Sequence, residues 1–200
     1  MLKVGLTGSI AVGKSFVCDC LRGLGCYVLD ADQTAREVVA RGTDGLAEII
    51  KHFGNGILQP DGELERKKLG AIVFADKAKR ELLNSIVHPR VIEAQDNWLR
   101  SVVIQHPNDI AVVDAALMVE SGGYKRFDKL IVVWCEPEIQ LARLLDRDNL
   151  SEHAAKMRIT AQMPQEEKKR FADYLIDTSS GFDNTRRQTV QVVEQMRNVS

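Results

Sequence analysis

The sequence has few cysteines, no long hydrophobic run and almost no net charge, and each absence argues against a class of protein. The four cysteines follow no disulfide or zinc-ribbon spacing, so we expect reduced, buried or half-buried thiols. No run of about 18 apolar residues occurs, so we expect no membrane-spanning helix. The formal net charge of -1 gives no general attraction to nucleic acid or to an anionic membrane.

Local charge and the first residues of the chain agree with this picture. The basic runs Arg66-Lys67-Lys68 and Lys168-Lys169-Arg170 lie beside acidic residues and lack interleaved aromatic residues, so we expect solvated surface at both. The apolar stretch at the start of the chain is interrupted by Gly8 and Lys14, so it is too short for the apolar region of a signal peptide. We therefore expect a cytoplasmic protein with a single domain at residues 2–199 and, as the favoured state, a monomer.

Short apolar segments alternate with helical patterns along the chain. The expected strands span residues 2–7, 27–29, 109–114, 130–134 and 174–176. The expected helices span residues 14–24, about 30–40, 44–52, 76–105, 137–146 and 183–197, with an interruption near His88-Pro89. This order indicates an α/β fold, with a five-stranded parallel sheet flanked by helices. The helical stretch between the second and third strands is too long for a crossover, which predicts a helical insert at roughly residues 60–105.

The segment after the first expected strand matches the phosphate-loop pattern G-x-x-x-x-G-K-[ST] at every fixed position. It reads Gly8-Ser9-Ile10-Ala11-Val12-Gly13-Lys14-Ser15 and leads into an expected helix. In such a loop, glycines allow a tight turn whose backbone N–H groups point at phosphate oxygens, and the helix dipole favours the same anion. Lys14 is expected to reach the β- and γ-phosphates, and the Ser15 hydroxyl to ligate Mg²⁺. The sequence therefore predicts binding of a nucleoside triphosphate.

Several features favour a small-molecule kinase over the other proteins that use this loop. The N-K-x-D and D-x-x-G segments typical of small GTPases are absent. A kinase must hold an acceptor and exclude water, and the helical insert and an arginine-rich stretch at roughly 143–165 offer material for both tasks. Arg143 and Arg147 are four residues apart, so both would face phosphates from one side of a lid helix. Arginines four apart are by themselves usually exposed surface residues, but their position after a strand–helix unit of a phosphate-loop fold favours a role in the lid.

Asp30-Ala31-Asp32 follows the second expected strand directly. In open α/β sheets the ligand crevice lies outside the carboxyl ends of the strands, so one of these carboxylates is placed to accept a proton from a hydroxyl. The alternative is a carboxylate that caps the next helix. Spacing alone leaves the two interpretations open.

Taken together, the motifs resemble those of one family, the dephospho-coenzyme A kinases, along nearly the whole chain. In order, they are Leu6-Thr7-Gly8-Ser9-Ile10, Gly13-Lys14-Ser15, Val28-Leu29-Asp30-Ala31-Asp32, Ala35-Arg36-Glu37-Val38-Val39, His88-Pro89-Arg90, Leu117-Met118-Val119-Glu120, Arg143-Leu144-Leu145-Asp146-Arg147-Asp148, Ala161-Gln162-Met163-Pro164 and Ala172-Asp173-Tyr174-Leu175-Ile176-Asp177-Thr178-Ser179. The phosphate loop alone does not separate this family from other kinases. The D-A-D, H-P and A-D-Y-x-I-D elements in this order do.

The resemblance implies ATP-dependent, in-line phosphorylation of the ribose 3′-hydroxyl of dephospho-CoA, the last step of coenzyme A synthesis. It implies catalytic roles for Asp32, Lys14 and Arg143. It implies ATP binding by Gly8, Ser9, Ile10, Ala11, Val12, Gly13, Lys14, Ser15, Phe16, Arg147, Asp177 and Ser179. It implies acceptor binding by Thr7, Asp32, His88, Arg90 and Glu120, with Mg²⁺ on Ser15. On spacing alone, His88 would be only a helix-break residue.

One departure from the family pattern is visible. Ala116 replaces the proline that often precedes the leucine pair of the family, which removes local rigidity near Glu120. The main alternative function is a nucleoside or nucleoside-monophosphate kinase, which shares the loop, sheet and lid but has a different acceptor pocket. A non-catalytic nucleotide-binding module is a second alternative. A nucleic-acid-binding protein is disfavoured by the charge balance.

Overall fold

The computed structural model describes residues 1–199 and contains two compact units. The larger unit comprises Met1–Asp30 together with the chain from Ser101 onward, and the smaller unit comprises Ala31–Arg100. The larger unit holds the sheet, whereas the smaller one is helical. Among the described residues, no helix is long and apolar enough to cross a membrane.

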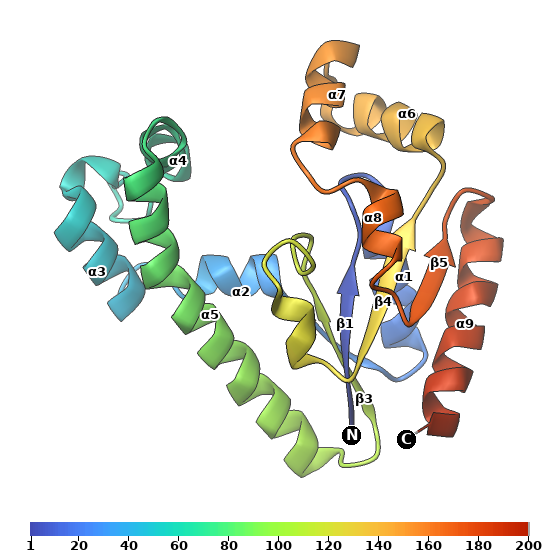
Figure 1. The fold of residues 1–200 in the computed structure, drawn as a ribbon. Helices are drawn as coiled ribbons and strands as arrows, with labels where there is room; N and C mark the ends of the chain where they lie inside the picture. Colours follow the sequence, from blue (N-terminus) through green and yellow to red (C-terminus); the bar gives the residue numbers. More distant parts are fainter. Residues whose placement is uncertain (200) are drawn as a thin grey trace. The chain divides into compact units, whose positions relative to one another are not determined.

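The larger unit is built on a five-stranded parallel sheet, as predicted. Its strands are β1 (Leu2–Thr7), β2 (Tyr27–Asp30), β3 (Ile110–Asp114), β4 (Lys129–Trp134) and β5 (Tyr174–Asp177). They lie in the order β2-β3-β1-β4-β5, with β1 in the centre (Figure 1). Because both faces of a parallel sheet are covered, its strands are rich in apolar residues, and the middle residues of β1, β3 and β4 are buried.

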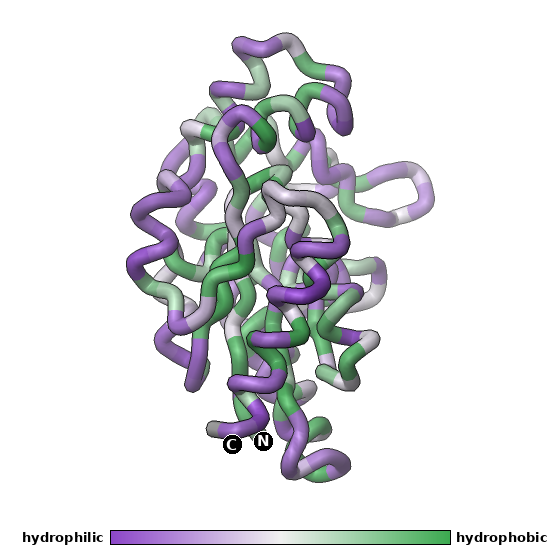
Figure 2. Tube along the Cα trace, turned by 90° about the vertical axis from the view of Figure 1, so that its right-hand side faces the viewer, coloured by the Kyte–Doolittle hydropathy of each residue, from purple (hydrophilic) through white to green (hydrophobic). Residues whose placement is uncertain are grey.

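Two long helices pack against one face of this sheet. They are α1 (Lys14–Gly23) and α9 (Gly181–Val199), which contact each other and enclose a core with β1 and β4. Val17 and Leu21 of α1 and Met196 of α9 are fully buried there. Figure 2 shows hydrophobic stretches along the middle of the trace, with many hydrophilic stretches toward its outside. This core holds the carboxyl end of β1, where the phosphate loop begins.

Three helices lie between β4 and β5: α6 (Pro137–Asp148), α7 (Glu152–Thr160) and α8 (Gln165–Lys169). A short 3₁₀ turn, η2 (Gly123–Arg126), precedes β4. Pro137 opens α6 at a position where its missing N–H costs nothing, and Ser151 caps α7 by accepting a hydrogen bond from the Ala154 N–H. The stretch expected to form a lid is thus helical.

The smaller unit has its own apolar core. It contains α2 (Ala31–Glu37), α3 (Asp44–Phe53), the 3₁₀ turn η1 (Asn55–Ile57), α4 (Arg66–Ala75) and most of α5 (Lys77–Gln105). Thr43 caps α3 by accepting a hydrogen bond from the Leu46 N–H. The buried core residues are Val39, Leu46, Ile49, Ile57, Leu64, Leu69 and Ile86. Arg66, Lys67 and Lys68 are exposed, as predicted.

The predicted interruption near His88-Pro89 is wrong, because α5 continues through Pro89. Proline removes one helical hydrogen bond and crowds the preceding turn, which usually breaks a helix. In the turn that the proline disturbs, Nη1 of Arg90 donates to the Ile86 carbonyl at 2.7 Å, one residue after the Ser85 carbonyl that loses its N–H donor. Sequence patterns do not reveal this side-chain donor.

Candidate active site

Polar side chains gather at the carboxyl edge of the sheet. Asp30 ends β2 and Asp114 ends β3, and the two residues are Cα partners in the sheet. Leu6 of β1 is also paired with Asp114, so the phosphate loop that follows β1 begins beside this aspartate. Asp177 ends β5 at the same edge, opposite Trp134 of β4. In open α/β sheets this edge is where ligands bind.

The glycines of the phosphate loop are required by its geometry. A Cβ atom on Gly8 would lie only 2.5 Å from the backbone oxygen of Val133 in the neighbouring strand β4. Gly13 has φ of 88°, in the left-handed region, and immediately precedes α1. The loop therefore runs tightly from the end of β1 to the N-terminus of α1, the arrangement expected of an anion-binding loop.

Lys14 forms an ion pair across this edge. Its Nζ lies 2.9 Å from Oδ1 and 3.3 Å from Oδ2 of Asp114. The exposed fractions of the two side chains are only 17% and 14%. Sequence reasoning missed Asp114 as a functional residue. The available signal was an aspartate at the end of a fully apolar strand, the position of the acidic residue that holds Mg²⁺ in many phosphate-loop proteins.

The surroundings of Asp114 fit a magnesium ion. Cys18 of α1 approaches Asp114, with Sγ 3.5 Å from Oδ2, and Ser15 lies one helical turn earlier on the same side of α1. Burial, followed by the nearby Asp114 carboxylate, raises the pKa of the Cys18 thiol to about 12, so it stays protonated. Within the described residues no group of three His, Cys, Asp or Glu side chains could hold a metal. One carboxylate and one hydroxyl suit Mg²⁺, which takes its other oxygens from water and phosphates.

The other loop residues have distinct surroundings. Ser9 is 4% exposed, and its Oγ is the one buried side-chain oxygen or nitrogen without a hydrogen-bond partner in the part of the chain that the structure describes. The backbone N–H of Ile10 donates to Gln162, and its backbone carbonyl accepts from Gln140. Phe16 follows the loop in α1 and packs against Phe182 of α9, with ring centroids 4.6 Å apart.

The two arginines expected in the lid have different partners. Arg143 of α6 donates from Nη1 to Oγ1 and from Nη2 to the backbone oxygen of Thr178, both at 2.8 Å. The same Thr178 hydroxyl donates to the Val12 carbonyl, so Thr178 links Arg143 to the phosphate loop. Arg147 instead pairs with Asp148, as does Arg158 of α7. The hydrogen bond from Arg147 holds the pKa of Asp148 below its ordinary value.

The turn after β5 is held by several hydrogen bonds. Oδ1 of Asp177 accepts hydrogen bonds from the backbone N–H and the hydroxyl of Ser179. The Ser179 hydroxyl oxygen in turn accepts from the N–H of Glu136, the residue directly before α6. Gln188 of α9 holds the Asp177 peptide through two further hydrogen bonds. Asp177 and Ser179, which the resemblance implies border the nucleotide, are thus both held by hydrogen bonds.

Glu120 is held by a buried lysine. Lys168 of α8 is 1% exposed, and its Nζ lies 2.9 Å from Glu120 Oε1 and 2.8 Å from the Ala116 carbonyl. The Thr7 hydroxyl donates to the same carbonyl at 3.1 Å. The expectation of a solvated Lys168 is therefore wrong, because α8 packs on β4 and carries this ammonium inward. The neighbouring Lys169 covers the Trp134 ring at 3.5 Å.

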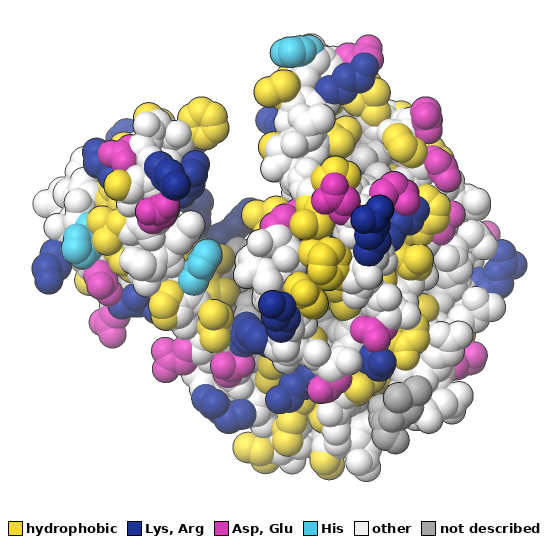
Figure 3. All heavy atoms as spheres, viewed as in Figure 1, with side chains coloured by type: hydrophobic (Ala, Val, Ile, Leu, Met, Phe, Trp, Pro, Cys, Tyr) yellow, Lys and Arg dark blue, Asp and Glu magenta, His cyan; other side chains and the backbone are white. Residues whose placement is uncertain are grey.

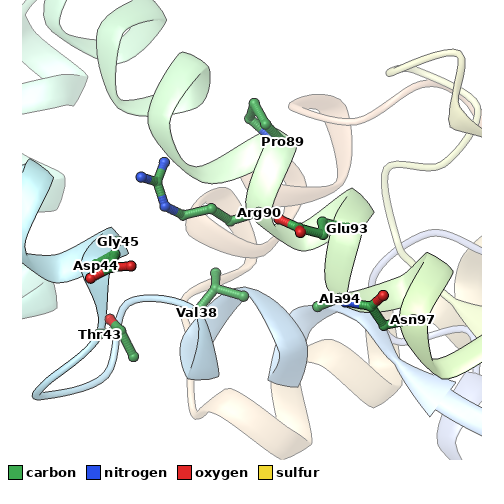
Figure 4. A pocket seen from close by; sticks show the side chains of 9 residues that line it. All are labelled: Val38, Thr43, Asp44, Gly45, Pro89, Arg90, Glu93, Ala94 and Asn97. Atoms are coloured by element: carbon green, nitrogen blue, oxygen red, sulfur yellow. The ribbon is translucent and has the colours of Figure 1, made fainter.

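The smaller unit contains the other residues implied to bind the acceptor. Asp32 is exposed in the first turn of α2, and His88 is exposed on α5. Arg90 reaches from α5 toward the start of α3 (Figure 4). It donates to a carboxylate oxygen of Glu48. It lines a hollow of about 480 Å³ with Thr43, Asp44 and Gly45, among others. His88 is not among the residues that line this hollow.

Charges on the surface are mixed. On the face of the larger unit shown in Figure 3, Lys and Arg side chains are interspersed with Asp and Glu rather than gathered into one basic area. All four cysteines are free, and Cys18, Cys26 and Cys135 are buried, as predicted.

Comparison with known proteins identifies the family to which this site belongs. The family model described as dephospho-CoA kinase matches residues 2–184. The chain belongs to the dephospho-CoA kinase family. It is 44% identical over 195 residues to the dephospho-CoA kinase of Listeria innocua, covering 98% of this chain and 97% of that protein. Members of the family are phosphotransferases that use ATP as co-substrate, and the phosphate loop fits that class of reaction.

Solved structures agree with this assignment. The structure of the dephospho-CoA kinase from Campylobacter jejuni matches with a TM-score of 0.74 and 29% identity, covering 98% of this chain and 97% of that one. A crystal structure from Thermus thermophilus matches with a TM-score of 0.83 and 27% identity over the same shares of the two chains. The dephospho-CoA kinase fold thus extends over nearly the whole chain.

Proposed function

We propose that this protein transfers the γ-phosphoryl group of ATP to the ribose 3′-hydroxyl of dephospho-CoA, giving coenzyme A and ADP in the last step of coenzyme A synthesis. The observation that carries the proposal is the phosphate loop whose Lys14 meets Asp114 at the carboxyl edge of the sheet. We further propose that the protein acts as a monomer in the cytoplasm. The free cysteines agree with a reducing compartment.

The donor half of the site lies in the larger unit. Apart from that of Ile10, which donates to Gln162, the backbone N–H groups of the loop from Gly8 to Ser15 would surround the phosphates, and Lys14 would leave Asp114 to reach the β- and γ-phosphates. Ser15, with Asp114, would hold Mg²⁺, which neutralises phosphate charge when bound. Asp177 and Ser179, together with Phe16 and Arg147, would border the rest of the nucleotide.

Charge that develops during transfer would be stabilised from α6. The transferring group spreads negative charge over its equatorial oxygens, and a guanidinium is well suited to stabilise it. Arg143 is the best candidate, because its contact with Thr178 brings it next to Val12 of the loop.

Asp32 is the proposed catalytic base for the acceptor. Asp32 would accept the proton of the 3′-hydroxyl as that oxygen bonds to the γ-phosphorus and the bond to the ADP oxygen breaks, without a phosphoenzyme. The exposure of Asp32 supports this role, since a general base must be accessible to the substrate. His88, Arg90, Thr7 and Glu120 would bind and orient the acceptor.

Exchange of Asp32 tests this assignment. Asp32→Asn removes the proton acceptor with little change in shape, so kcat should fall by about 10²- to 10⁴-fold while the KM for ATP stays near its wild-type value. Asp19→Asn, at an exposed position on α1, is the matched control. Steady-state assays with dephospho-CoA, and with a panel of nucleosides and nucleotides, measure both constants. An unchanged kcat in Asp32→Asn would restrict this residue to stabilising the first turn of α2.

A further inference from the structure

The backbone N–H and the backbone carbonyl of Ile10 in the phosphate loop are both hydrogen-bonded to glutamine side chains. Its N–H donates to Oε1 of Gln162 at 2.7 Å. Its carbonyl accepts from Nε2 of Gln140 at 2.8 Å. Neither contact is local, because Gln140 belongs to α6 and Gln162 lies beyond the end of α7.

A third glutamine, Gln165, fixes the orientation of the Gln140 side chain. Nε2 of Gln165 donates to Oε1 of Gln140 at 2.9 Å, and Oε1 of Gln165 accepts from the Cys135 N–H at 3.1 Å. Gln140 is only 2% exposed. Since Gln140 and Gln165 each donate with the amide nitrogen and accept with the oxygen, neither amide is able to flip without breaking two bonds. The chain of hydrogen bonds therefore has a defined direction, from β4 to the loop.

The backbone between these contacts is strained. Ala11, the residue after Ile10, has φ of 61°, a left-handed conformation that a non-glycine residue keeps only where its surroundings hold it. On its other side, the Val12 carbonyl is fixed by the Thr178 hydroxyl at 2.8 Å. Ala11 thus lies between Ile10, which glutamine side chains of the expected lid anchor, and Val12, which Thr178 anchors from the residue after β5.

We propose that Gln140, Gln162 and Gln165 form a glutamine clamp whose function is to position the phosphate loop. Gln162 and Gln165 flank Met163-Pro164, where the lid stretch returns to the sheet, so the clamp couples the end of the lid to the shape of the loop. The Met163 N–H is itself anchored by Glu120 Oε1 at 3.2 Å. These are positioning residues, and their role rests on the proposed function in that the loop binds the phosphates of ATP.

Gln162→Met tests the direct contact. Methionine keeps the length of the side chain but offers no oxygen to the Ile10 N–H, so the loop should lose one anchor while the fold is retained. We expect the Kd for MgATP, measured by tryptophan fluorescence without acceptor, to rise about 3- to 10-fold, the value of one hydrogen bond. The kcat/KM for ATP should fall by a similar factor, and the KM for dephospho-CoA should stay within about two-fold. Gln191→Met, at an exposed position on α9, is the control.

Gln140→Glu tests the direction of the chain. An ionised carboxylate would set an oxygen against the Ile10 carbonyl, whereas a protonated carboxyl would donate to it as the amide does. Relative to the wild type, MgATP binding by this variant should therefore be weak near about pH 8 and recover toward about pH 5.5. A residue needed only for packing would give a binding defect that does not change with pH.

The outcomes separate the clamp from the proposed function. Gln162→Met binding MgATP as tightly as Gln191→Met would overturn the clamp, and so would equal changes in the constants for ATP and for the acceptor. A pH-independent defect in Gln140→Glu would overturn it as well. Because MgATP binding is measured without acceptor, wild-type protein that binds MgATP but fails to phosphorylate dephospho-CoA would contradict only the proposed function.

Discussion

Replacing the buried Lys168 by methionine should destabilise the larger unit strongly. Methionine fills most of the same apolar space, so the loss comes from the ammonium, which is 2.9 Å from Glu120 Oε1 and 2.8 Å from the Ala116 carbonyl. Removing one partner of a buried ion pair costs about 3–5 kcal/mol. The Glu120 side chain is 23% exposed, so water solvates its carboxylate in part once the ammonium is gone. We therefore expect the free energy of unfolding to fall by about 2–4 kcal/mol. For a chain of this size that lowers Tm by about 4–16 °C.

The measurement is urea unfolding followed by the fluorescence of Trp134, whose ring lies against Lys169 in the same unit. The double variant Lys168→Met with Glu120→Gln removes both charges, and so should recover at least about half of the lost stability. The reasoning would be refuted if Lys168→Met stayed within about 0.5 kcal/mol of the wild type. It would also be refuted if the two substitutions simply added.

Two further predictions concern the site and its thiols. Arg143→Ala should lower kcat by about 10³-fold or more, whereas Thr178→Val, which removes only the hydroxyl that Arg143 contacts, should cost far less; comparable turnover in both variants would exclude Arg143 from catalysis. Burial raises the pKa of Cys18 to about 12 and that of Cys26 to about 11, from 9.0 in each case. The unfolded chain therefore loses these protons first, so stability should be independent of these thiols below about pH 9 and fall above it. Alkylation of both thiols at about pH 9 should be slow until the protein unfolds, and rapid labelling of the folded protein would contradict their burial.

The parts of the fold that depend on local sequence were predictable. The phosphate loop is a contiguous motif, and the apolar strands that surround it are short enough to recognise by composition. The five-stranded parallel sheet follows from their alternation with helices. The family resemblance, which depends on motifs in a fixed order, then predicted the reaction.

The parts that depend on contacts distant in the sequence were not predictable. Lys14 and Asp114 are 100 residues apart, and only the pairing of β1 with β3 brings them together. Lys168 looked like a solvated residue because its partner Glu120 lies in another part of the chain. Pro89 indicates a helix break because it lacks an N–H, whereas α5 continues through it. The catalytic role of Asp32 stays a prediction, since it depends on how an acceptor binds.

The most direct test of the central claim is acceptor-dependent ADP formation by the purified wild-type protein with MgATP and dephospho-CoA. We predict ADP and coenzyme A in equal amounts, with a product that is heavier than the acceptor by one phosphoryl group carried on the ribose 3′-hydroxyl. Turnover should be absent when dephospho-CoA is replaced by nucleosides or nucleoside monophosphates. ADP formation that is independent of dephospho-CoA, or faster with a nucleoside, would contradict the account.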